Sequence, residues 1–308
     1  TAPRTYFRFL YLQRLTRSSC YTSNKLILSV SLQLLHPNYG LIGHWCGGVL
    51  VHPMWLLTTA HCIHNELFNL PVPALWTAVL GEWDRAEQKG AYVPIEKIVL
   101  HHRFHNYQHD IALMKLTRPA DVSKSSRIRT ICLPPFEPPI TNFDTVKSKT
   151  DSSNGEEWRK SDNERGNNDL IYDSATLDKI DPFIDDNNRL DFKDECYATG
   201  WGREQTNGTL TDVLLEAEVP VLPLNICRER YSLTLPLNDG HLCAGSTDGS
   251  TGACVGDSGG PLQCRTGGRW ELRGLTSFGS GCARRGVPDV YTNVAHYVSW
   301  IYAHVYAS

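Results

Sequence analysis

The sequence has 308 residues, of which 41% are hydrophobic, and its formal net charge at pH 7 is -3. That apolar content is enough to form a globular core in one or two domains. The near-neutral charge argues against nucleic acid or an anionic membrane as the main partner. No stretch approaches about 18 uncharged apolar residues, so the sequence predicts no membrane-spanning helix.

Short apolar runs alternate with polar residues and recur between Gly, Pro and Asn turns, a pattern that is typical of an all-β protein. The runs fall into two clusters, one in each half of the chain. They comprise 49–57, 95–100 and 111–116 in the first cluster, and 213–221 and 272–278 in the second.

An acidic segment, 136–195, separates the two clusters. It holds 16 Asp and Glu against 8 Lys and Arg, and Ser, Asn and Asp dominate its composition. Such a segment has too little apolar surface to build a core, so we expect it to be disordered or a solvated loop. The part from 181 to 195 lacks the mid-loop Gly and the ligand spacing of an EF-hand, so we expect no calcium there.

The most informative motif is the glycine-rich turn 256–261, with the sequence GDSGGP, which places Ser258 where its hydroxyl can face a substrate. Serine is a poor nucleophile at neutral pH, so it needs a general base and a group that orients the base. Both lie upstream. His61 in the sequence TAHC (59–62) can act as the base, and Asp110 in DIAL (110–113) can orient it.

These three motifs together resemble those of the chymotrypsin-like (S1) serine peptidases, in the chain order His, Asp, Ser. The resemblance implies an all-β fold of two six-stranded antiparallel β-barrels, with the active site between them and a C-terminal helix at 295–305. It also implies two parts of the chain: an N-terminal, propeptide-like segment (1–24) and a peptidase domain (25–308). The peptidase domain would comprise a first barrel (25–132), the acidic insertion (136–195) and a second barrel with the terminal helix (196–308).

The resemblance also assigns chemical roles. His61 would take a proton from Ser258, Asp110 would fix the imidazole, and the amides of Gly256 and Ser258 would form the oxyanion hole. No cofactor is implied. We expect no zinc at the histidine-rich stretch either, because the resemblance places its residues on a strand end and a loop: His101, His102, His105 and His109.

The family pattern, laid over the ten cysteines, gives every one of them a partner. Disulfides at this density imply an oxidising compartment, so we expect a secreted, extracellular protein. The glycosylation sequon that begins at Asn207 agrees with this expectation. The implied pairs are Cys46 with Cys62, Cys196 with Cys264, Cys227 with Cys243, Cys254 with Cys282, and Cys20 with Cys132.

The specificity pocket departs from that of trypsin. Trypsin carries an Asp at the pocket base, which pairs with Lys or Arg of the substrate, but this chain has Gly252 there. Asp289 stands at a wall position that is glycine in trypsin. It either meets a cationic substrate side chain or is buried on its own hydrogen bonds, so the residue before the cut (P1) is expected to be Lys, Arg or a mixture of basic and apolar types. The remaining implied pocket residues are Ala253, Ser277, Phe278 and Gly279.

The activation signal of the family is also altered. Members are cut to release Ile or Val followed by glycines, and the new amine pairs with the Asp before the catalytic serine, here Asp257. This chain has Leu15 after Arg14 in that slot and lacks the glycines. Ser31, His44 and Asp257 match a trio that holds some precursors inactive, so we expect the chain to be a zymogen.

A secreted serine endopeptidase is therefore the leading functional hypothesis. The expected partners are peptide and protein substrates, an activating protease and proteinaceous inhibitors. One alternative is a catalytically silent homologue that acts as a binding protein. Another is an α/β-hydrolase esterase, since 256–260 also satisfies G-x-S-x-G, but that fold needs its Asp and His after the serine and only 50 residues follow Ser258.

Overall fold

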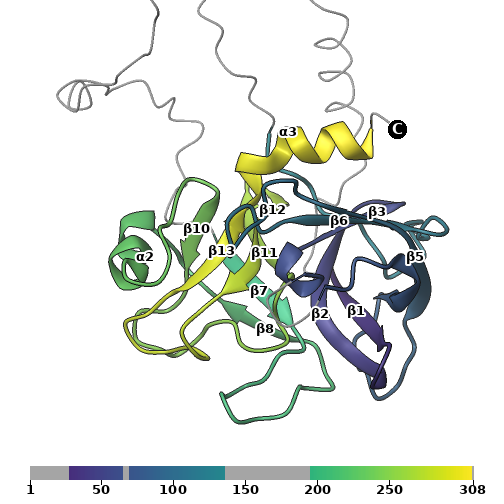
Figure 1. Cartoon of the computed structure of the whole chain (residues 1–308), viewed down its shortest axis with the longest axis horizontal. Coiled ribbons are helices and arrows are strands. Elements are labelled where there is room, and N and C mark those ends of the chain that lie inside the picture. Colours follow the sequence, from purple (N-terminus) through teal and green to yellow (C-terminus); the bar gives the residue numbers. More distant parts are fainter. Residues whose placement is uncertain (1–27, 65–68, 136–194, 307–308) are drawn as a thin grey trace, which may run out of the picture. The chain divides into compact units, whose positions relative to one another are not determined.

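The computed structural model describes residues 28–64, 69–135 and 195–306. The predicted N-terminal segment 1–24, with Cys20, lies outside the described residues, as does the acidic insertion apart from Glu195. The remaining chain forms two antiparallel sheets and two α-helices (Figure 1).

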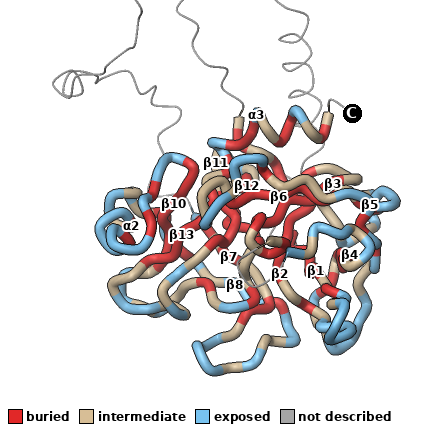
Figure 2. The backbone as a smooth tube through the Cα atoms, in the orientation of Figure 1, coloured by how far each residue is buried: buried red, intermediate tan, exposed pale blue. Residues whose placement is uncertain are grey.

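The first sheet is a closed six-stranded barrel with the order β1-β2-β3-β6-β5-β4. Its alternating apolar residues point inward, where Leu32, Leu34, Leu50, Leu56 and Trp76 are almost fully buried (Figure 2). The strands are β1 (Ser29–His36), β2 (Gly40–His52), β3 (Trp55–Thr58), β4 (Trp76–Leu80), β5 (Ala91–Leu100) and β6 (Ala112–Leu116).

The second sheet has seven strands in the order β8-β7-β11-β12-β13-β10-β9. Its two outermost strands are consecutive in the sequence and are separated only by Val219 and Pro220, which has no N–H to offer the ladder. If these two strands are counted as one interrupted strand, the second sheet has six strands, as the resemblance implies. The strands are β7 (Cys196–Gly200), β8 (Leu215–Glu218), β9 (Val221–Leu222), β10 (His241–Ala244), β11 (Pro261–Thr266), β12 (Arg269–Phe278) and β13 (Asp289–Asn293).

Helix α3 (Val294–Val305) ends the described chain and confirms the predicted terminal helix. It buries Tyr297, Ile301 and Val305 at helical spacing against apolar residues of both sheets, such as Leu57 and Leu275. The helix thus helps to fix one barrel against the other. The all-β fold expected from the sequence is confirmed.

Three shorter helical segments complete the described elements: α2 (Leu224–Tyr231), and the 3₁₀ turns η1 (Ala60–Cys62) and η2 (Pro73–Leu75). The sequence analysis predicted none of them, because each is too short for a periodic apolar pattern. Among the described residues, no helix has both the length and the apolar character needed to cross a membrane.

Four of the five predicted disulfides are present: Cys46–Cys62, Cys196–Cys264, Cys227–Cys243 and Cys254–Cys282. Cys132 is disulfide-bonded as well, but Cys20 lies outside the described residues, so that pairing stays a prediction. Each bridge is expected to stabilise the fold by about 2 to 4 kcal/mol. Cys46–Cys62 joins β2 to η1, the turn that carries His61.

Candidate active site

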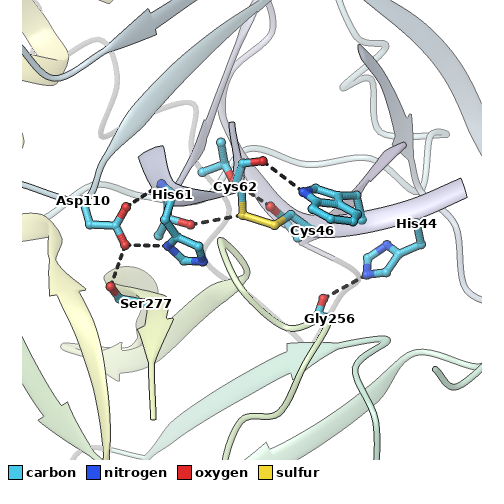
Figure 3. The surroundings of a disulfide bond; sticks show 11 residues. His44, Cys46, His61, Cys62, Asp110, Gly256 and Ser277 are labelled. Carbon is cyan, nitrogen blue, oxygen red and sulfur yellow. Dashed lines mark hydrogen bonds and ion pairs between the residues drawn. A yellow bond between two sulfur atoms is a disulfide. The ribbon is translucent and has the colours of Figure 1, made fainter. Parts of the chain in front are cut away.

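His61 and Asp110 are brought together by the pairing of two strands. Thr58, at the end of β3, pairs with Ala112, at the start of β6, so the residues beyond these two ends are neighbours. His61 Nδ1 lies 2.7 Å from Asp110 Oδ2, and the His61 amide donates to Asp110 Oδ1 at 2.8 Å (Figure 3). Two hydrogen bonds therefore fix the imidazole in position and orientation.

The second sheet also holds Asp110. The Ser277 hydroxyl on β12 donates to Asp110 Oδ2 at 2.6 Å, and the Thr292 hydroxyl on β13 donates to the Asp110 carbonyl at 2.6 Å. Burial by itself would raise the pKa of Asp110, but the nearby His61 charge and the hydrogen bonds from His61 and Ser277 lower it. Asp110 is thus a buried carboxylate that stays ionised.

The turn that carries Ser258 packs against the first barrel. The Gly47 amide on β2 donates to the Ser258 carbonyl at 2.7 Å. A Cβ added at Gly47 would lie 2.7 Å from Gly260 Cα, and one added at Gly259 would strike the hydroxyl of Thr58. Because only glycines permit this approach, the turn lies beside the end of β3, three residues before His61.

Two amides of the same turn have no hydrogen-bond partner among the described residues. Asp257, Gly259 and Gly260 each donate their N–H to a backbone carbonyl. The amides of Gly256 and Ser258 make no such bond within the described residues. Gly256 has φ +101°, a conformation that favours glycine. This pair of unused donors is what the predicted oxyanion hole requires.

His44 holds the other side of the Gly256 peptide. Its Nε2 donates to the Gly256 carbonyl at 2.9 Å (Figure 3). Its Nδ1 accepts from the Ser31 hydroxyl at 2.8 Å. Burial lowers the pKa of His44 to about 4. The hydrogen bond to Gly256 raises this pKa and so opposes burial in part, while the nearby Arg85 charge lowers it further. His44 is therefore neutral, and both ring nitrogens are used.

Asp257 does not join Ser31 and His44, which differs from the predicted trio. Its carboxylate accepts from the amides of Gly202 at 2.8 Å and Cys254 at 2.9 Å. It forms no ion pair within the described part of the chain. Burial raises the pKa of Asp257 to about 6, although the two amide bonds lower it. A cavity of about 240 Å³ adjoins this carboxylate and includes Gly200 and Gly202 in its lining.

Asp289 lies between the predicted base and mouth of the specificity pocket. Only 4% of its surface is exposed, and its Oδ2 accepts from the Ala253 amide at 2.7 Å. A Cβ on Gly252 would lie 2.8 Å from Oδ2, and one on Gly279 would strike Oδ1. The carboxyl group therefore fills the space that side chains at 252 and 279 would occupy.

The sequence analysis predicted no zinc site at the histidines that precede Asp110. His101 stacks on His102 and on His109, with ring centroids 4.8 Å apart in both pairs. The described residues contain no group of three or more His, Cys, Asp and Glu side chains arranged to hold a metal ion. His101 instead packs against Tyr297 and Trp300 of α3.

Sequence reasoning missed Tyr107, whose ring lies 5.4 Å from that of His61 and 5.1 Å from that of Phe278. The Tyr107 ring therefore lies next to His61, the candidate general base, and next to Phe278, a predicted pocket residue. Asn106, Tyr107 and His109 all have positive φ, and the Tyr107 carbonyl lies 3.3 Å from His241 Nε2. Nothing in the local sequence signals this conformation, because it contains no glycine.

Comparisons with known proteins identify the family of this chain. The family model for trypsin matches residues 21–177 and 178–301. Transmembrane protease serine 7 of Mus musculus is 30% identical over 266 residues, which cover 85% of this chain and 25% of that protein. The protein of the same name from Rattus norvegicus is 29% identical over 265 residues, or 84% of this chain and 25% of the relative. The chain thus spans about a quarter of the length of these curated relatives.

Proposed function

We propose that this chain, which belongs to the trypsin family, is a serine endopeptidase that cuts peptide bonds through an acyl-enzyme on Ser258. The observation that carries the proposal is the Asp110 carboxylate, which is bonded to His61 Nδ1 at 2.7 Å and to Ser277 at 2.6 Å. An imidazole held in this way at Nδ1 acts as a base through Nε2. Labelling of Ser258 by a fluorophosphonate probe tests the proposal.

In the proposed reaction, Ser258 Oγ attacks the scissile carbonyl while His61 Nε2 takes its proton. The negative charge that develops on the carbonyl oxygen is accepted by the amides of Gly256 and Ser258. The C–N bond then breaks and His61 returns the proton to the leaving amine. Water then attacks the acyl-enzyme while His61 takes its proton. The bond between Ser258 Oγ and the acyl carbon breaks, His61 returns the proton to Oγ, and the second product is released. Asp110 stays ionised and stabilises the imidazolium throughout.

The proposed P1 preference is Lys or Arg, or a mixture of basic and apolar residues. Asp289 supports it, because the carboxyl group lies between Gly252 and Gly279 and receives one hydrogen bond, from Ala253. A cationic P1 side chain would compensate the buried charge. An apolar P1 side chain would suit the same pocket when the carboxyl group is neutral.

We expect Asp289→Gly to shift P1 preference toward apolar residues. The loss of a desolvated ion pair costs about 2 kcal/mol or more, so turnover of Lys and Arg substrates should fall about 30-fold or more relative to Leu substrates at pH 8. A peptide library varied at P1 measures this ratio. Asp248→Asn removes an exposed acid from the loop before Gly252 and should leave the ratio unchanged. The same preference in the wild type and in Asp289→Gly would show that the carboxylate does not contact P1.

The proposed place of action is extracellular. The four disulfides support it, because such bonds persist in oxidising compartments. Asn207, in the glycosylation sequon, is exposed on the loop between β7 and β8, where an attached glycan would reach solvent. Peptide and protein substrates, proteinaceous inhibitors and an activating protease are the proposed partners.

The uncut chain is proposed to be a zymogen. Asp257 supports this, since its carboxylate accepts two amide bonds but pairs with no cation in the described residues. An amine released by cleavage would supply that cation and hold the turn that bears Gly256 and Ser258. The cavity beside Asp257 includes Ala198, Gly200 and Gly202 in its lining and offers space for such a terminus.

A further inference from the structure

Asp289 is a buried acid whose surroundings fully stabilise neither its neutral form nor its ionised form. Its Oδ2 receives one hydrogen bond, from the Ala253 amide at 2.7 Å, and its Oδ1 receives none within the described residues. An ionised carboxylate usually needs two or three donors to offset burial. A single donor leaves the neutral acid and the carboxylate close in free energy.

Among the residues that the structure describes, the groups packed around Asp289 provide no positive charge. Asp257 is acidic and disfavours ionisation of Asp289, and Tyr291 and Tyr231 are phenols whose pKa values burial and the Asp289 charge raise. Arg284 and Arg285, in the segment before Pro288, are exposed, and neither forms an ion pair with Asp289. Burial raises the pKa of Asp289 to about 7. The Ala253 hydrogen bond lowers this pKa, and the Asp257 charge raises it further.

Tyr291 gives a second sign of incomplete solvation at the same place. It lies two residues after Asp289 on β13, and alternate residues of a strand share a face. Its side chain is fully buried, and its hydroxyl has no hydrogen-bond partner in the described part of the chain. Strand β13 therefore carries two buried polar groups whose hydrogen-bonding capacity is not fully used within the described residues.

We propose that Asp289 selects the P1 side chain by its protonation state: the neutral acid favours apolar side chains, and the carboxylate favours Lys and Arg. This inference rests on the proposed peptidase function. The carboxyl group fills the space between Gly252 and Gly279, so a P1 side chain in this pocket would meet it directly. As pH rises, Asp289 loses its proton and the pocket changes from apolar to anionic. The preference of one enzyme would then differ between acidic and neutral surroundings.

The test is the ratio of kcat/KM for matched P1 Lys and P1 Leu peptides, measured with the activated enzyme between pH 5.5 and 8.5. Effects of pH on the catalytic groups that both substrates share cancel in the ratio. We expect the ratio to rise by about tenfold or more, with its midpoint near 7, since kcat/KM reports the ionisation of the free enzyme. Asp289→Asn cannot ionise at this position and should give a low ratio that does not change with pH. Glu229→Gln, which removes an exposed acid on α2, should behave as the wild type.

A binding measurement separates this inference from the proposed function. p-Aminobenzamidine, a fluorescent cation that resembles the Arg side chain, is titrated into the full chain carrying Ser258→Ala, which cannot turn over substrate. Its affinity should rise with pH through about 7 and be weak at every pH when Asp289→Asn is added. Loss of turnover together with pH-dependent binding would overturn only the peptidase function. A constant ratio or pH-independent binding in the protein with Asp289 intact would overturn the selection by Asp289.

Discussion

Ser258→Ala is expected to abolish labelling by a fluorophosphonate probe and to lower peptide hydrolysis by about 10⁶-fold, since no other group in the site can form the acyl-enzyme. His61→Ala should cause a loss of similar size, because the hydroxyl is not nucleophilic without its base. Asp110→Asn should cost about 10⁴-fold by stabilising the wrong imidazole tautomer. Gel-based labelling and peptide turnover by the activated chain measure these losses.

The matched control is Ser125→Ala, which removes an exposed hydroxyl that forms a hydrogen bond with the Ser123 hydroxyl. It should label and turn over substrate like the wild type. Circular dichroism and thermal unfolding establish that each variant is folded. If the activated wild type is folded but remains unlabelled, the chain is a silent homologue, and a binding role replaces the enzymatic one.

Cleavage by an Arg-specific protease is expected to raise activity by about 10² to 10³-fold, the effect typical of one oxyanion-hole donor, because a cation paired with Asp257 would hold the Gly256 amide in position. The reason is Asp257, whose carboxylate has no cation in the described residues of the uncut chain. Cleavage after Arg14 or Arg17 would create the amine that pairs with it. Turnover before and after treatment, with mass spectrometry of the products, measures the gain and locates the cut.

The control for activation is the double variant Arg14→Gln, Arg17→Gln, which should resist cleavage and remain at the low activity of the uncut chain. The predicted Cys20–Cys132 bridge should keep the residual N-terminal segment attached until a reductant is added. Full activity of the uncut chain would contradict the zymogen hypothesis. It would mean that the amides of Gly202 and Cys254, together with the His44 contact to Gly256, hold the turn without a cation.

Much of the fold followed from the sequence, because three short motifs carry the resemblance to one family. The runs 95–100, 111–116 and 272–278 each correspond to one strand, and the terminal helix and four cysteine pairs are present in the structure. The run 49–57 instead spans two strands, because the chain turns at Pro53 and Met54 between β2 and β3. The interruption at Pro220 was not predicted, because the run 213–221 reads as one strand. Only the sheet pairing shows that it divides into β8 and β9.

The parts of the site that the sequence could not specify depend on contacts between distant segments. Whether Asp289 is exposed to the pocket or buried depends on Ala253, Gly252 and Gly279, which are far from it in the chain. The position of Tyr107 depends on positive φ values at residues that normally avoid them. Motif spacing contains no information on either point.

The close approach of Gly47 and Gly260 has a consequence for how such a chain can change. A methyl group at Gly47 would lie 2.7 Å from Gly260 Cα, so the two halves meet where neither has a side chain. His61 and Asp110 belong to one half, while Ser258 and the Ser277 hydroxyl that holds Asp110 belong to the other. Neither half can retain a fraction of the activity alone. Selection for catalysis must therefore act on the fit between the halves, and it constrains a glycine that never touches substrate as strongly as a residue that does.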